Sequence, residues 1–163
     1  MRLRALLFAF VVLVIGACSS IDCPVENQVF TVYGVYSGEE VDTLHDTLYV
    51  WSKRSDGKDT LLLNRGVNLS NFFLPISNQH PEDILIFLVA DTAGHYTLDT
   101  VWIKKEDIPH FESVDCNPTF FHRLTSVRST HRGIDTITIN RSSVEYETTS
   151  STAHFHIDFK ARR

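Results

Sequence analysis

The stretch Ile84-Leu85-Ile86-Phe87-Leu88-Val89 is apolar at every position. A short apolar run of this kind, bounded by polar residues, indicates a strand that side chains cover on both faces. We therefore expect a central strand over 83–91 in the middle of the core.

Runs rich in β-branched and aromatic residues continue on both sides of this strand, and no helical pattern interrupts them. The last run alternates, with Phe155, Ile157 and Phe159 toward one side and polar residues toward the other, which predicts a strand with one face in water. Eight or nine strands are expected, within the ranges 28–37, 43–53, 59–65, 70–77, 83–91, 96–104, 121–130, 134–141 and 153–160.

The joints between these runs carry turn residues. Asp56-Gly57, Ala93-Gly94 and Arg132-Gly133 predict tight hairpins, and Pro75 places its strand at a sheet edge because proline cannot donate to the ladder. The segment 108–121 is the longest without a strand pattern and is expected to be a loop. The fold class is therefore all-β, an antiparallel two-sheet sandwich of immunoglobulin-like architecture with eight or nine strands, or alternatively a small β-barrel.

The amino terminus has the features of an export signal. Two positive charges, Arg2 and Arg4, precede an apolar run that is about half of the roughly 20 residues a membrane span needs. The run ends in Ile15-Gly16-Ala17-Cys18, which resembles the bacterial lipobox, although an ordinary signal peptide with a chance cysteine would look similar. We expect cleavage before Cys18 and a membrane anchor through lipid on Cys18.

This processing defines three parts: a leader over 1–17, a lipidated tether over 18–27 and a single β-domain over 28–163. Loss of the leader changes the formal net charge from −5 to −7, because the leader contains two arginines. An acidic domain is a poor candidate for binding nucleic acid, whose phosphates require a basic face.

The mature chain keeps two further cysteines, Cys23 and Cys116. An exported protein folds in an oxidising compartment, where a remaining pair of cysteines is more often bridged than free. We predict a disulfide between them, with metal binding as the weaker alternative.

Two blocks of sequence, 18–24 (Cys-Ser-Ser-Ile-Asp-Cys-Pro) and 109–118 (Pro-His-Phe-Glu-Ser-Val-Asp-Cys-Asn-Pro), resemble a family of small Bacteroidetes lipoproteins classed as a domain of unknown function. The resemblance implies an envelope with two membranes and an anchor in the outer one. No acidic run follows Cys18, which favours the periplasmic face.

Six of the twelve mature aspartates precede threonine, far more than chance would give. Such pairs are typical of strand starts, where Asp closes a turn and Thr begins the pleat. Asp-Thr-aliphatic also looks like the acceptor motif for O-glycosylation in Bacteroidetes. The candidate acceptors are Thr43, Thr47, Thr60, Thr92, Thr100 and Thr136.

The sequence indicates no catalytic residue, no cofactor and no metal site. His154 and His156 share one face of a strand, but nothing nominates further ligands, so solvent-facing histidines are the simpler interpretation. The leading hypothesis is a non-catalytic envelope module that binds a protein or glycan partner or accompanies a larger assembly. The alternative is a small carbohydrate-active hydrolase that uses the carboxylates of Glu106, Asp107 and Glu112.

Overall fold

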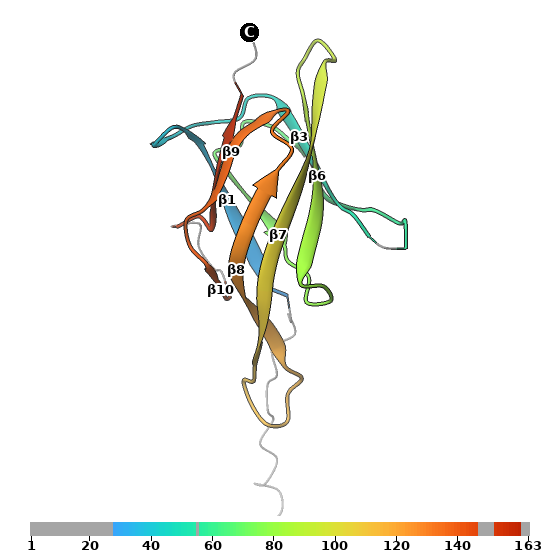
Figure 1. The fold of residues 1–163 in the computed structure, drawn as a ribbon, viewed down its shortest axis with the longest axis vertical. Helices are drawn as coiled ribbons and strands as arrows, with labels where there is room; N and C mark the ends of the chain where they lie inside the picture. The colour runs from blue at the N-terminus through green and yellow to red at the C-terminus, as the bar shows by residue number, and fades with distance from the viewer. Residues whose placement is uncertain (1–27, 55, 147–151, 161–163) are drawn as a thin grey trace, which may run out of the picture.

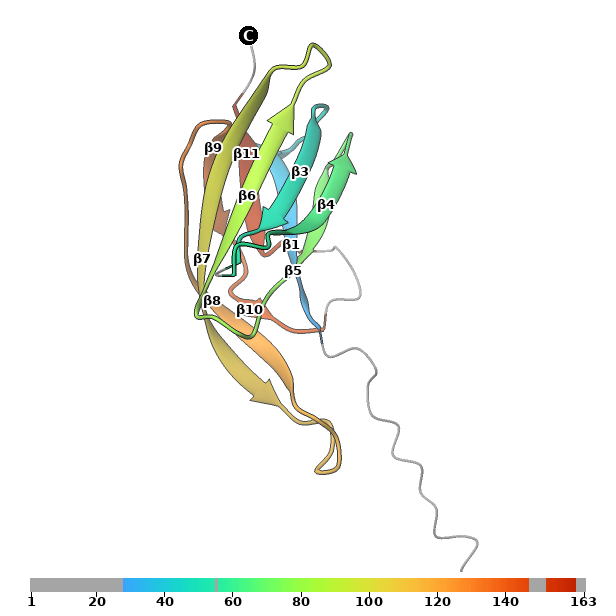
Figure 2. The same ribbon diagram turned by 90° about the vertical axis from the view of Figure 1, so that its right-hand side faces the viewer.

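The computed structural model describes residues 28–54, 56–146 and 152–160 (Figure 1). Within these ranges eleven strands form two sheets, one of them curled into a half-barrel (Figure 2). No helix in the described residues has the length and apolar character to cross a membrane. Leader and tether, 1–27, lie outside these ranges.

The first sheet is built around its longest strand, β1. Strand β11 pairs with β1 in parallel and β9 pairs with β11 antiparallel, while β2 and β5 share the other edge of β1. The strands of this five-stranded sheet are β1 (Phe30–Ser37), β2 (Glu40–Val41), β5 (Asn71–Pro75), β9 (Ile134–Ile139) and β11 (Phe155–Phe159).

The second sheet is antiparallel throughout and has the order β10-β8-β7-β6-β3-β4. Its longest strands, β7 and β8, form a hairpin that projects beyond the rest of the sheet (Figure 2). The strands of this six-stranded sheet are β3 (Thr47–Ser52), β4 (Thr60–Gly66), β6 (Glu82–Ala90), β7 (Tyr96–His110), β8 (Thr119–Ser129) and β10 (Ser143–Val144).

Aromatic side chains from both sheets meet in the core. The ring of Tyr33 stacks on Phe72 and on Phe155, with centroids 4.9 Å and 4.8 Å apart, and lies 6.1 Å from Phe87 of the other sheet. All four residues are buried. Each such ring contributes roughly 1.5–3 kcal/mol on leaving water, so this cluster is a main source of stability.

The all-β, two-sheet prediction is confirmed, and every expected strand has a counterpart. The sheets were expected to be antiparallel, and this is wrong for the first sheet, where β1 and β11 pair in parallel. The strands β2 and β10 were not predicted, because a strand of two residues is too short to show an alternating sequence pattern. Pro75 lies on the edge strand β5, as predicted. An immunoglobulin-like architecture is not shown and stays a prediction.

The prediction of a loop over 108–121 is wrong. Strand β7 continues through Ile108, Pro109 and His110, which pair with Phe121, Phe120 and Thr119 at the start of β8. Proline is tolerated here because the projecting hairpin has free edges. Only 111–118 connects the two strands.

Two further expectations need correction. Strand β6 is central, but only Leu85, Phe87 and Val89 are buried, while the opposite face is half-buried because no second layer covers it. The Arg132-Gly133 turn is not a hairpin, because β8 and β9 belong to different sheets.

Candidate functional site

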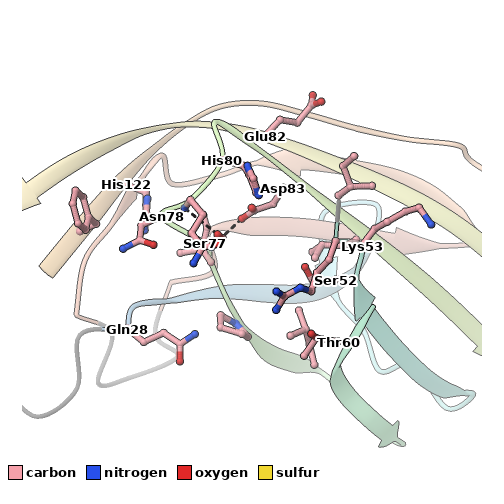
Figure 3. A pocket seen from close by; sticks show the side chains of 18 of the residues that line it. Gln28, Ser52, Lys53, Thr60, Ser77, Asn78, His80, Glu82, Asp83 and His122 are labelled. Carbon is pink, nitrogen blue, oxygen red and sulfur yellow. Dashed lines mark hydrogen bonds between the residues drawn. The ribbon is translucent and has the colours of Figure 1, made fainter. Parts of the chain in front are cut away.

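A cleft of about 630 Å³ opens at the end of the molecule where β1 begins, β3 ends and β6 begins (Figure 3). One wall is the β5–β6 connection, 76–81, and the other is the end of β3 with the start of β4. Its polar lining consists of Gln28, Ser52, Lys53, Arg54, Asp56, Thr60, Ser77, Asn78, Gln79, His80, Glu82, Asp83 and His122.

Hydrogen bonds to side chains and backbone hold the β5–β6 connection in place. The Ser77 N–H donates to Asp83 Oδ2 at 3.1 Å, and the Gln79 N–H donates to Ser77 Oγ at 3.1 Å. The Lys105 ammonium donates to the carbonyl oxygen of His80 at 2.7 Å, and its backbone N–H donates to Pro81 O at 3.0 Å. This wall of the cleft is therefore fixed to β7.

Lys105 also belongs to a charged network beside the cleft. Its Nζ lies 3.0 Å from Asp107 Oδ1, and the same oxygen lies 2.7 Å from His122 Nδ1. The side chains of Lys105 and His122 are 0% and 1% exposed. Lys105 continues the alternation of the buried Val101 and Ile103 along β7, so its side chain points inward.

Burial lowers the pKa of His122 below its usual range, and the hydrogen bond to Asp107 opposes this only in part. His122 is therefore neutral at pH 7 and donates its Nδ1 proton to the Asp107 carboxylate. Burial raises the pKa of Asp83, although the Ser77 N–H and the Lys105 charge work in the other direction.

We expect Asp107→Ala to lower the free energy of unfolding by about 2 kcal/mol, because Lys105 and His122 both lose a charged partner where water cannot fully replace it. Urea unfolding of the full chain measures this. Glu106→Ala is the matched control, since Glu106 is exposed and lies 3.7 Å from an exposed Arg123. Equal losses for the two variants would contradict the network.

The carboxylates named for a hydrolase do not converge. Glu106 pairs with Arg123, Asp107 pairs with Lys105 and His122, and Glu112 pairs with His110 at 3.1 Å. None of these three lines the cleft.

The six candidate glycosylation sites occupy different environments. Thr47 and Thr60 begin β3 and β4, as strand starts should, whereas Thr100 and Thr136 lie within β7 and β9. Thr60, Thr92 and Thr136 are exposed, and Thr43, Thr47 and Thr100 are half-buried. Thr92 lies on the β6–β7 turn, where Asp91 Oδ1 accepts hydrogen bonds from the N–H groups of Ala93 and His95.

We predict that at least one of these threonines, Thr92 or Thr43 before the others, carries a glycan in the native host. Intact-mass spectrometry of the native protein should show a mass above that of the lipidated polypeptide, and Thr92→Ala or Thr43→Ala should lower it. A mass equal to the lipidated polypeptide would leave strand starts and turns as the whole explanation of the repeat.

The predicted anchor Cys18 and the disulfide partner Cys23 lie outside the described residues. Cys116 is buried in the β7–β8 connection, 8% exposed. Both the lipidation and the pairing of Cys23 with Cys116 therefore stay predictions.

His154 is not solvent-facing, contrary to the expectation. It is 0% exposed, its Nδ1 accepts the Val32 N–H at 2.9 Å, and its Nε2 lies 2.7 Å from Arg141 Nη2. The contacts with Val32 and Arg141 cover the His154 side chain on this face of the sheet. His156 is half-buried, and the described residues contain no group of three side chains able to hold a metal ion.

The cleft residues had few distinguishing features in the sequence. Neither His122 nor Asp83 belongs to a recognisable sequence motif. A signal was present at Lys105, because it alternates with Val101 and Ile103 on the inward face of the strand.

Fold and site together define an all-β protein of two sheets with a polar cleft at one end and a buried Lys-Asp-His network beside it. The chain belongs to the family of unknown function DUF6452, which it matches over residues 29–159. No curated protein and no solved structure matches it.

Proposed function

We propose that this protein is a lipid-anchored, non-catalytic binding module of the bacterial cell envelope, and that its ligand occupies the polar cleft. The ligand is an envelope protein or a glycan. Lipid on Cys18 provides the membrane attachment, in the outer membrane and on its periplasmic face.

The proposed localisation is supported by the leader and by Ile15-Gly16-Ala17-Cys18, together with the resemblance to small Bacteroidetes lipoproteins. The short tether, 18–27, would keep the domain close to the membrane surface. A single acyl chain anchors a protein only marginally, and lipoproteins carry two or three, so release would be rare.

The observation that carries the binding proposal is the cleft itself. Its volume of about 630 Å³ is within the range of small-ligand sites, about 300–1,000 Å³. Hydroxyl and amide side chains, including Ser52, Thr60, Asn78 and Gln79, line it and can both donate and accept hydrogen bonds. Such groups can hold a polar ligand in one orientation.

Binding is favoured over hydrolysis because a glycosidase needs two carboxyl groups that face each other across the bound sugar. Glu106, Asp107 and Glu112 each pair with a different cation, outside the cleft. Of the carboxylates that line the cleft, Asp56 pairs with Arg54, Glu82 lies 3.5 Å from Arg128, and Asp83 accepts the Ser77 N–H. The network of Lys105, Asp107 and His122 satisfies its own charges and stabilises the cleft wall.

The test is photocrosslinking in intact cells. A photoreactive amino acid replaces Asn78 in the cleft, and in a matched protein it replaces Thr136, which is exposed on β9 away from the cleft. We expect a specific adduct from position 78 and none from position 136, and Thr60→Trp should abolish the adduct by filling the cleft. Equal adducts from both positions, or an adduct that Thr60→Trp leaves unchanged, would contradict the proposal.

A further inference from the structure

We infer that the outer face of the five-stranded sheet carries a separate binding site for an uncharged saccharide, in a hollow beside Tyr36 and His156. The hollow shares no lining residue with the cleft. The inference is therefore independent of the proposed function and can hold or fail without it.

The hollow has a volume of about 410 Å³. Asn71, Gly34 and His156 lie in one row across β5, β1 and β11, because Gly34 pairs with each of the other two. A Cβ at Gly34 would lie 2.8 Å from Cε2 of Tyr36 and 3.1 Å from Cβ of Ala153. The ring of Tyr36 therefore lies close over the backbone, and a side chain at position 34 would displace it.

Aromatic rings form one side of the hollow. The rings of Tyr36 and His156 stack with centroids 3.9 Å apart and planes inclined by 26°. Both residues are half-buried, so part of each ring stays accessible. An accessible aromatic ring offers an apolar surface against which the C–H groups of a sugar ring pack.

The polar groups of the hollow have unused hydrogen-bonding capacity. Within the described part of the chain, the side chains of Tyr36, Ser70, Asn71, Thr152 and His156 make no hydrogen bond. Hydroxyl and amide groups can donate and accept, as sugar hydroxyls do.

Asn140 adds a positioned acceptor. Its Nδ2 donates to Ala153 O at 2.9 Å, which fixes the amide and leaves Oδ1 available. The hollow thus combines an aromatic surface with converging hydroxyl and amide groups.

The charge of the lining selects the ligand class. The described lining residues contain no Asp, Glu, Lys or Arg, so nothing there would pair with a phosphate, a carboxylate or an ammonium group. A peptide strand is disfavoured as well, because β11 pairs with one side of β1 and β2 and β5 with the other, so its backbone is already used. A neutral saccharide satisfies both conditions.

Saturation-transfer NMR on the full chain in detergent micelles tests the inference. The probes are D-mannose, D-galactose, L-fucose and N-acetyl-D-glucosamine, with D-glucuronate as the charged comparison. We expect saturable binding of at least one neutral sugar, weaker binding of D-glucuronate, and a loss of affinity of about tenfold or more in Asn71→Ala/His156→Ala.

Two controls make the result specific. Phe73→Ser, on the same sheet face but outside the hollow, and Asp135→Asn, exposed on β9 and outside both the hollow and the cleft, should bind the sugar as the unchanged protein does. If the double variant fails to fold, Asn71→Asp replaces it, since Asn71 is exposed and the fold should tolerate the change. The added negative charge should weaken the binding of D-glucuronate further. Absence of binding by all four neutral sugars, equal binding of D-glucuronate, or unchanged binding by the hollow variants would overturn the inference.

Discussion

Asp99→Asn is expected to lower the free energy of unfolding by about 3–5 kcal/mol, a large share of the roughly 5–15 kcal/mol available to a domain of this size. Asp99 lies within β7 and is 2% exposed. Its Oδ1 accepts hydrogen bonds from Thr130 Oγ1 and the Arg132 N–H, both at 2.7 Å. Its Oδ2 accepts the N–H groups of Gly133 and Ile134 at 2.6 Å and 2.9 Å.

These four bonds fix the chain where it crosses from one sheet to the other, between β8 and β9. In asparagine an NH₂ group replaces one of the two carboxylate oxygens, and each of these oxygens accepts two hydrogen bonds. The NH₂ group would therefore face two donors, and at least one buried N–H would lose its acceptor. The backbone at Gly133 also lies close to Thr97, because a Cβ there would clash with the Thr97 side chain. Urea unfolding measures the loss, and Asp135→Asn, an exposed neighbour on β9, should cost less than about 0.5 kcal/mol.

The effect of Asp99 should depend on pH. Burial alone would raise the pKa of Asp99, but the hydrogen bonds from Thr130, Arg132, Gly133 and Ile134 outweigh it and the pKa is lowered. A lowered pKa means that the stabilisation is complete above the ordinary value of about 3.9 and is lost as pH falls through the folded-state pKa. The difference in stability between the unchanged protein and Asp99→Asn should therefore be constant near pH 7 and shrink below about pH 4. A pH-independent difference would contradict this role of the carboxylate.

Cys116→Ser is expected to lower the free energy of unfolding by up to about 4–5 kcal/mol and the melting temperature by several degrees, with the β-sheet signature retained. The predicted bridge to Cys23 closes a loop of 93 positions (116 − 23), and crosslinking a chain over such a loop removes much of the entropy of the unfolded state. It would tie the chain before β1 to the tip of the β7–β8 hairpin.

Ser113→Ala, in the same connection, should change stability little and serves as the control. A free-thiol assay on the unreduced, unfolded mature protein is the direct check. Two reactive thiols would end the disulfide prediction, and a covalent dimer through Cys23 would replace it with an intermolecular bridge.

The strands could be predicted because their evidence is local. The alternation of Phe155 and Ile157, the edge position of Pro75 and the glycine turns at Gly57 and Gly94, with φ of 75° and 89°, follow from single-residue chemistry. The parallel pairing of β1 with β11 could not be predicted, because it joins residues more than 100 positions apart.

The sites were hidden for a related reason. In the sequence, Asp99 is one of six aspartates followed by threonine and has no other distinguishing feature. It becomes a buried hydrogen-bond acceptor only because residues 130–134 fold against it. His154 looked exposed because alternation does not show what covers the outer face of a sheet. The network around Lys105 was hidden in the same way, because His122 meets Asp107 only through the pairing of β7 with β8.

Whether the protein is a lipid-anchored module is decided by the mass of its native amino-terminal peptide, measured beside membrane fractionation of Cys18→Ser. We predict a peptide that begins at Cys18 with a mass increment of two or three acyl chains, and an uncleaved precursor without lipid for Cys18→Ser. An unmodified Cys18, or a Cys18→Ser protein that matures to the same amino terminus and stays with the membrane, would rule out the anchor.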